Sequence, residues 1–290
     1  MFVTRQSGHC VPVHTARGRV SATNERCARR DVQDCRQNEA QPLHLRTNSG
    51  VQCAGDCLFF GGGWRTGSPQ QFEKQCRYLA GRGMVAITAD YRVWTRQHVK
   101  PVQCVADARS AIRWVRTNAA KLGVDPNRIA AGGGSAGGHL AACTAFITEF
   151  DEPTEDKTVS ATPHALVLFN PDLVLAPMEG YNVGDIGKRA TEKHYGTKPE
   201  NISPAHHIYK GAPPTIIFHG KADTTVPYMT TEAFAAEMIK AGNRCELVGF
   251  DGESHGFFNR EPFLTQTLKA VDQFLVTLGW LKSLPTGINK

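Results

Sequence analysis

The sequence predicts an α/β fold, in which a mostly parallel β-sheet carries helices on both of its faces. From residue 57 onward, short apolar runs alternate with longer amphipathic segments. The apolar runs are continuous rather than alternating, which is typical of strands that are buried on both faces of a parallel sheet. Glycine and proline separate many of the runs and mark the turns between them.

Each expected element rests on its own pattern. The expected strands are residues 57–60, 84–89, 128–131, 165–169, 215–218 and 245–250. The expected helices are residues 68–79, 105–122, 136–148, 231–241 and 264–278. The second helix is the clearest, because its apolar residues recur about every 3.6 positions until Gly123 ends it. Two long stretches, residues 149–163 and 171–211, interrupt the alternation. Loops of this length are usually functional or mobile, and the second is placed to cover a pocket.

The composition excludes several classes of protein. Of the 290 residues, 41% are hydrophobic and 21% charged, which excludes global disorder and a coiled coil. The chain lacks a run of about 18 apolar residues, so no transmembrane helix is expected. The formal charge of +6 comes without a basic cluster interleaved with aromatic residues, so no nucleic-acid partner is expected. No cysteine and histidine spacing typical of a metal site occurs, so no metal is expected. The serine chemistry inferred below needs no organic cofactor, so none is expected either.

The first 50 residues differ from the rest of the chain. They contain eight arginines and no lysine, and they show neither helical nor strand periodicity. We expect residues 1–50 to be an atypical, loosely structured segment and residues 51–290 to form the domain that carries the chemistry. Residues 1–20 lack the apolar stretch of a secretory signal peptide, which makes the cytoplasm the default expectation for location. The sequence predicts no oligomeric state.

A candidate nucleophile lies between an expected strand and an expected helix. Residues 133–137 read Gly-Gly-Ser-Ala-Gly and fit the pattern G-x-S-x-G in the strand–turn–helix setting that the pattern requires. Small residues two positions before and after Ser135 allow a sharp turn that exposes its hydroxyl. The N-terminus of the following helix favours negative charge that develops there. A glycine-rich turn that contains a serine by chance fits this setting less well.

A second glycine-rich turn, residues 61–63, follows the expected strand at residues 57–60 and precedes Trp64. Successive glycines let backbone N–H groups point into a site, so we expect this turn to stabilise an oxyanion together with the N–H of Ala136. Trp64 and Gly134 are the expected walls of the substrate pocket. Ordinary packing would explain Trp64 equally well.

Two later residues complete a candidate triad. Asp223 follows the expected strand at residues 215–218, and His255 follows the next strand. Their order after Ser135 is the serine–acid–histidine order of α/β-hydrolases. His255 would accept the proton of Ser135, and Asp223 would hold the imidazole in the required tautomer. The alternatives are a turn-forming aspartate and an ordinary loop histidine.

Other titratable residues compete for these roles less well. Asp172 also follows a strand, but one strand too early in the chain. His139 lies one helical turn after the nucleophile and is expected to be a packed helix residue. His206 and His207 have no third ligand at metal spacing and are expected to be a surface or lid pair.

Five motifs that occur in the right order resemble those of the α/β-hydrolase esterases. The motifs are residues 59–68 (FFGGGWRTGS), 89–92 (ADYR), 133–140 (GGSAGGHL), 220–223 (GKAD) and 254–256 (SHG). The resemblance is to the bacterial carboxylesterase and acetylesterase set, which includes acetyl-xylan and feruloyl esterases and is related to the hormone-sensitive-lipase-like enzymes. It covers residues 57–280 and implies an α/β-hydrolase fold. It also implies a triad and oxyanion donors, namely Ser135, Asp223 and His255 with the amides of Gly62, Gly63 and Ala136.

The chain departs from this family pattern in two places. Relatives usually have a histidine where this chain has Phe60, and that histidine braces the glycine loop by hydrogen bonds. Relatives also carry two or three antiparallel strands before the loop, which residues 1–50 do not show. Either the sheet lacks that edge, or atypical sequence builds it.

These observations together predict a serine esterase that hydrolyses short-chain carboxylic esters, of acetyl type and including carbohydrate-linked ones, through an acyl-enzyme. The expected partner is a small-molecule or carbohydrate ester, with no membrane involved. One alternative is an arylformamidase or peptidase of the same fold. A different class is a non-catalytic binding protein of this fold, against which the presence of all three triad residues argues.

Overall fold

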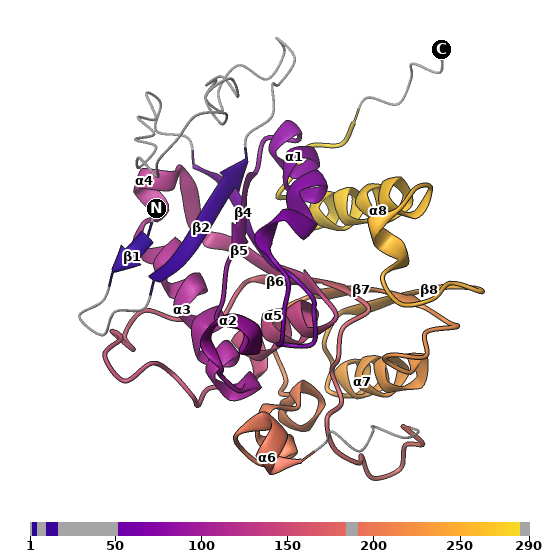
Figure 1. Ribbon diagram of the computed structural model, residues 1–290. Helices are drawn as coiled ribbons and strands as arrows, with labels where there is room; N and C mark the ends of the chain where they lie inside the picture. Colours follow the sequence, from indigo (N-terminus) through magenta and orange to yellow (C-terminus); the bar gives the residue numbers. More distant parts are fainter. Residues whose placement is uncertain (1, 5–9, 17–51, 184–190, 285–290) are drawn as a thin grey trace.

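The computed structural model describes residues 2–4, 10–16, 52–183 and 191–284 (Figure 1). Within these residues, eight strands form one sheet in the order β1-β2-β4-β3-β5-β6-β7-β8. The strands are β1 (Phe2–Thr4), β2 (Cys10–Ala16), β3 (Cys53–Phe59), β4 (Val85–Ala89), β5 (Val124–Gly134), β6 (Ala165–Phe169), β7 (Thr215–Gly220) and β8 (Cys245–Phe250). The α-helices are α1 (Glu73–Gly81), α2 (Trp94–Gln97), α3 (Pro101–Thr117), α4 (Ala119–Leu122), α5 (Ala136–Phe146), α6 (Glu192–Tyr195), α7 (Tyr228–Lys240) and α8 (Phe263–Thr277).

The six strands from β4 to β8 in this order pair in parallel, which confirms the predicted parallel sheet. Each of them overlaps one of the strands expected from the apolar runs. β5 is the longest of these strands and lies at the middle of the sheet. Because parallel strands end at a common edge, the turns after β3, β5, β6, β7 and β8 gather there.

Two hydrophobic clusters, one on each face, hold the helices against the sheet. Successive residues of a strand belong to different clusters: Phe59 is part of the first cluster, and its neighbour Leu58 is part of the second. The first cluster packs α3, α5 and α7 against the sheet, and the second packs α1 and α8. Figure 1 shows α1 and α8 on the side opposite α3, α5 and α7. This arrangement explains why the strands read as continuously apolar runs.

An antiparallel edge is present at the N-terminal side of the sheet. β2 pairs antiparallel with β4, with Val13 opposite Ala89, and β1 pairs antiparallel with β2. The sequence analysis left two alternatives, and the structure shows the second: the edge exists and is built from atypical sequence. Local patterns do not reveal it, because strand pairing is a long-range contact and β2 lacks a clear alternation of apolar residues. Residues 17–51 lie outside the described residues, so for them the expected loose structure stays a prediction.

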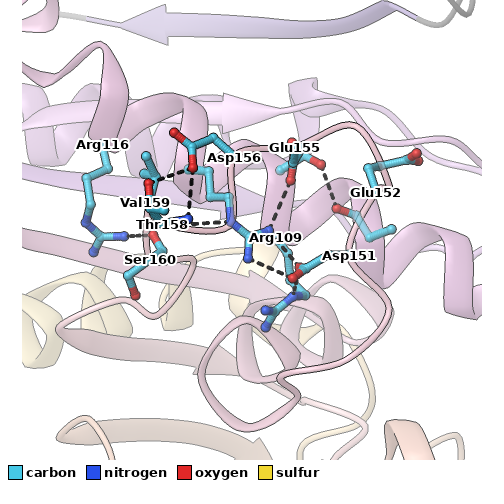
Figure 2. A network of polar contacts seen from close by, with 12 residues as sticks. Arg109, Arg116, Asp151, Glu152, Glu155, Asp156, Thr158, Val159 and Ser160 are labelled. Carbon is cyan, nitrogen blue, oxygen red and sulfur yellow. Dashed lines mark hydrogen bonds and ion pairs between the residues drawn. The ribbon is translucent and has the colours of Figure 1, made fainter.

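Arginines of α3 hold the acidic loop, residues 149–163, against the body of the protein (Figure 2). The Asp151 carboxylate accepts hydrogen bonds from Arg109 Nε at 2.5 Å and from Arg113 at 2.6 and 2.9 Å. Arg113 also donates to the carbonyl oxygen of Val159 at 2.8 Å. The side chains of Arg109, Arg113 and Asp151 are at most 8% exposed. The structure therefore gives this long loop a fixed path along α3.

The second long stretch, residues 171–211, contains α6 and two 3₁₀ turns, Pro199–Ile202 and Pro204–His207. Residues 184–190 within it lie outside the described residues. In the part of the chain that the structure describes, no helix has both the length and the apolar character needed to cross a membrane.

Candidate active site

The candidate nucleophile occupies a strained turn between β5 and α5. Ser135 has φ +55° and ψ −124°, a backbone conformation that is costly for a residue with a side chain. A Cβ atom on Gly137 would lie 2.1 Å from the carbonyl oxygen of Phe59, and one on Gly133 would lie 2.5 Å from the same oxygen. Only glycine fits at these two positions, which explains the small residues on either side of the serine.

The three candidate triad residues come together at the carboxyl edge of the sheet. The Ser135 hydroxyl lies 2.9 Å from His255 Nε2, and His255 Nδ1 lies 2.7 Å from Asp223 Oδ2. Ser135 follows β5, Asp223 follows β7, and His255 follows β8. The distances fit a chain in which the serine O–H donates to one ring nitrogen while the other ring N–H donates to the carboxylate.

Asp223 is held as a carboxylate by several donors. Burial by itself would raise its pKa, but hydrogen bonds from His219 and His255 and from the amide of Val226 outweigh burial and lower the pKa well below the usual range. The amides of Thr225 and Val226 donate to Oδ1 at 2.8 and 2.9 Å. A carboxylate that stays ionised can orient His255 and stabilise its protonated form.

Two residues that the sequence analysis missed support this carboxylate. Asn170 Nδ2 donates to Asp223 Oδ2 at 2.9 Å, and His219 Nε2 lies 3.3 Å from the same oxygen. Both are fully buried. Asn170 has φ +42°, a conformation that asparagine tolerates better than most residues. Its place directly after an expected strand is a signal in the sequence, but the adjacency of β6 to β7, which brings it to Asp223, is known only from the structure.

The glycine turn lies against the nucleophile and is braced without the family's histidine. A Cβ atom on Gly61 would lie 3.3 Å from the Cβ of Ser135. Gln71 Oε1 accepts from the Gly61 N–H at 2.6 Å, and the Tyr91 hydroxyl donates to the carbonyl oxygen of Phe60 at 2.7 Å. The rings of Phe60 and Tyr91 stack with their centroids 4.1 Å apart. Gln71 and Tyr91 thus hold the glycine turn in place, although Phe60 stands where a bracing histidine was expected.

The backbone settings of the three expected oxyanion donors can be compared. Gly62 has φ +127° and Gly63 has φ +61°, so the turn needs glycine at both positions. In the described loops, no backbone or side-chain acceptor takes the N–H of either residue. Ala136 is the first residue of α5, and its N–H therefore has no acceptor within the helix.

The two expected pocket residues have different surroundings. Trp64 lines a cavity of about 460 Å³ that also borders Gly63. Its indole Nε1–H donates to His139 Nδ1 at 3.2 Å, and His139 Nε2–H donates to the carbonyl oxygen of Ile202 at 2.7 Å. Gly134 is not among the described residues of that cavity. A Cβ atom there would lie 2.6 Å from the ring of Phe258, so Gly134 makes room for aromatic packing.

The three competing histidines have partners outside the triad, whereas Asp172 is buried close enough to the triad to feel its charges. Burial lowers the pKa of His139 to about 4, although its bond to Ile202 opposes this shift, so it is a packed helix residue as expected. His206 Nδ1 lies 2.8 Å from Ser203 Oγ, and His207 Nε2 lies 2.9 Å from the carbonyl oxygen of Glu200. Burial raises the pKa of Asp172 to about 7, although the nearby His255 acts to lower this pKa.

Comparisons with known proteins identify the family of this chain. The BD-FAE family model matches residues 57–238. Esterase LipC of Mycobacterium tuberculosis is 30% identical over 211 residues, which cover 68% of this chain and 51% of LipC. Carboxylesterase NlhH of the same species is 39% identical over 238 residues, which cover 76% of this chain and 71% of NlhH. This chain spans about half the length of the first of its curated relatives.

Solved structures extend the likeness to nearly the whole chain. Propionate-bound esterase 2 of Thermogutta terrifontis is 45% identical, with a TM-score of 0.81, and the match covers 99% of this chain and 96% of that one. The apo form of the same esterase is 52% identical over 81% of this chain and 87% of its own, with a TM-score of 0.76. The chain therefore belongs to the BD-FAE family and has the α/β-hydrolase fold of carboxylic ester hydrolases.

Proposed function

We propose that the chain is a serine esterase that hydrolyses short-chain carboxylic esters through an acyl-enzyme, with residues 51–290 as its catalytic domain. The observation that carries the proposal is the hydrogen-bonded chain from Ser135 Oγ through His255 to Asp223, with steps of 2.9 and 2.7 Å. Binding alone would not require a nucleophile, a base and an ionised acid in this arrangement. The esterase and carboxylesterase relatives support the same reaction class.

Acylation begins when the Ser135 oxygen attacks the ester carbonyl carbon and His255 Nε2 takes the hydroxyl proton. The resulting oxyanion is stabilised by the amides of Gly62, Gly63 and Ala136. His255 then gives its proton to the departing alkoxide, so the alcohol leaves and an acyl ester remains on Ser135.

Deacylation repeats the sequence with water. His255 removes a proton from the attacking water, and the second oxyanion forms in the same place. When this intermediate collapses, the bond between the acyl carbon and Ser135 Oγ breaks, His255 returns its proton to the serine oxygen, and the carboxylic acid is released. Asp223 keeps its charge throughout and stabilises the imidazolium in both halves.

An aliphatic acyl group is proposed to be short. Esterase 2 of Thermogutta terrifontis has been solved with propionate and with butyrate bound, and its close similarity to this chain supports an acyl site of the same size. A carbohydrate that carries an acetyl ester is one substrate of this class. Acetylated xylan alongside small acetate esters would show whether the site accepts a sugar as the alcohol.

A series of p-nitrophenyl esters from acetate to laurate tests the proposal. We expect kcat/KM to be highest for acyl chains of about two to six carbons and to fall steeply beyond them. Ser135→Ala should reduce hydrolysis by about 10³-fold or more while the circular dichroism spectrum is unchanged. Wild-type turnover by purified Ser135→Ala would contradict the proposal. Hydrolysis of an N-formyl aromatic amide in preference to all esters would indicate the formamidase alternative instead.

A further inference from the structure

A preformed cavity lies beside the glycine turn at residues 61–63, which we call the oxyanion turn. Residues of α2, α3 and α6 line the cavity. Its volume of about 460 Å³ is within the range of sites that bind small ligands. Gly63 and Trp64 border it, so the cavity begins at the turn that holds two of the three proposed oxyanion donors, Gly62 and Gly63. We call it the basic cavity, and its cationic members are Arg65, Lys100 and Lys193.

The charge of the basic cavity is one-sided. Its described lining residues include these three cationic side chains and no aspartate or glutamate. Among the described residues, none of the three cationic groups forms an ion pair. The carboxylate of Asp90, which precedes α2 in the chain, pairs with Arg96 at 2.5 Å, and Glu192 precedes Lys193 without being one of the described lining residues. As far as the described residues line it, the cavity therefore presents unneutralised positive charge to a ligand.

Helix α3 adds to this field. Pro101, the first residue of this 17-residue helix, lines the basic cavity. The N-terminus of a helix carries a partial positive charge. The helix dipole therefore has the same sign as the three cationic side chains.

Two indole rings, Trp64 and Trp94, form apolar walls of the basic cavity. Trp64 is 7% exposed and fixed through its hydrogen bond to His139, whereas Trp94 is 42% exposed. The backbone N–H of Trp94 donates to the carbonyl oxygen of Trp64 at 3.1 Å, and that of Thr95 donates to the carbonyl oxygen of Arg65 at 2.9 Å. These bonds tie the backbone of α2 to the oxyanion turn, so the two residues that carry the indole walls are held beside each other before a ligand arrives.

We propose that the basic cavity is a substrate subsite for a carboxylate, preferably carried on an aromatic ring, in the acyl or the alcohol part of the ester. The indoles would contact the ring, and the lysine and arginine groups would bind the carboxylate. This inference rests on the proposed esterase function, because it places the other end of the same molecule at the oxyanion turn. It goes beyond that function by naming a charged class of ester.

Two matched substrate pairs test the subsite and show which part of the ester enters it. For the alcohol side, 4-acetoxybenzoate is compared with neutral 4-acetoxybenzamide. For the acyl side, the mono-p-nitrophenyl ester of terephthalate is compared with p-nitrophenyl 4-carbamoylbenzoate. In at least one pair, we expect kcat/KM at low ionic strength to favour the anionic member by about fivefold or more, the size expected of a few exposed charge pairs. This preference should shrink as salt is added.

Variants decide whether the basic cavity causes the preference. The double variant Lys100→Gln/Lys193→Gln should lose most of it while hydrolysis of the neutral esters is unchanged. Lys198→Gln is the matched control, since Lys198 lies close to α6 in the chain but is not among the described lining residues. No preference in either pair, or a preference that the double variant retains, would overturn the proposal.

A binding measurement separates this proposal from the esterase proposal. Calorimetry on the Ser135→Ala protein compares 4-acetamidobenzoate with 4-acetamidobenzamide, neither of which needs to be hydrolysed. We expect the carboxylate to bind more tightly and the double variant to remove the difference. If this result is obtained while the wild type hydrolyses no ester, the esterase function fails and the anion subsite stands. Equal binding of the two compounds would overturn the subsite whatever the activity.

Discussion

Replacement of Asp56 by asparagine should change how stability depends on pH. Asp56 lies within β3, is 1% exposed, and has both carboxyl oxygens buried without a hydrogen-bond partner among the described residues. Burial raises its pKa to about 7, and the nearby amide of Cys57, which makes no full hydrogen bond with it, opposes the rise only in part. A charge in this position is costly because nothing compensates for its lost hydration.

The direction follows from the proton balance. The pKa of the carboxyl is about 7 in the folded chain against 3.8 for an ordinary aspartate, so the folded state keeps a proton that the unfolded state releases. The free energy of unfolding therefore falls as the pH rises from about 4 to about 7, and above pH 7 this contribution is constant. About three pH units at about 1.4 kcal/mol each give a total loss of about 4 kcal/mol, of which about 2 to 3 kcal/mol falls between pH 5 and pH 8.

Urea denaturation at pH 5 and pH 8 measures this effect. The asparagine side chain does not titrate, so the stability of Asp56→Asn relative to wild type should rise by about 2 to 3 kcal/mol from pH 5 to pH 8. Other titrating groups are common to both proteins and cancel in this difference. Asp251→Asn, at a side chain that is 88% exposed, serves as control and should show no such rise. A difference between Asp56→Asn and wild type that is the same at both pH values would refute the reasoning.

Three further substitutions test the packing around the site and the acidic loop. Gly137→Ala places a methyl group 2.1 Å from the backbone oxygen of Phe59, so we expect little soluble folded protein; a melting temperature within about 2 °C of wild type would contradict this. Asp151→Asn removes the carboxylate that pairs with Arg109 and one of the two carboxylates that pair with Arg113, which keeps Glu155 at 3.0 Å. It should lower the free energy of unfolding by about 2 to 3 kcal/mol. A loss below about 1 kcal/mol in urea titration would show that this pairing does not hold the loop. Gln71→Ala removes the acceptor of the Gly61 N–H and should lower kcat for p-nitrophenyl acetate by about threefold to tenfold with KM nearly unchanged; an unchanged kcat would mean that the turn is rigid without it.

The sequence predicted the parts of the molecule that local patterns encode. The parallel strands follow from continuous apolar runs, since a strand buried on both faces has little room for polar positions. Ser135 could be found because its strained turn requires small residues at fixed positions nearby in the chain. The pairing of Asp223 with His255 could be expected from their places after consecutive strands, because parallel strands end at one edge of the sheet.

The remaining features depend on contacts between distant segments. Tyr91 stacks on Phe60 across 31 positions of the chain, and no local pattern marks the two as partners. Asn170 reaches Asp223 from a neighbouring strand end, which is visible only once the strand order is known. The antiparallel pairing of β2 with β4 similarly joins segments that are far apart in the chain, as the pairing of Val13 with Ala89 shows. Such contacts are decided by tertiary packing, which overrides local propensity.

Reaction with paraoxon, followed by peptide mass spectrometry, tests the central claim most directly. An organophosphate transfers its phosphoryl group to an activated serine oxygen, and esterase 2 of Thermogutta terrifontis has been solved phosphorylated by this compound. The proposed mechanism predicts one diethylphosphoryl group per chain, located on Ser135, with loss of ester hydrolysis in proportion to labelling. His255→Ala should react far more slowly, because the serine then lacks its base. A protein that keeps its esterase activity after prolonged exposure, or that carries the label on a residue other than Ser135, would contradict the assignment of Ser135 as the nucleophile.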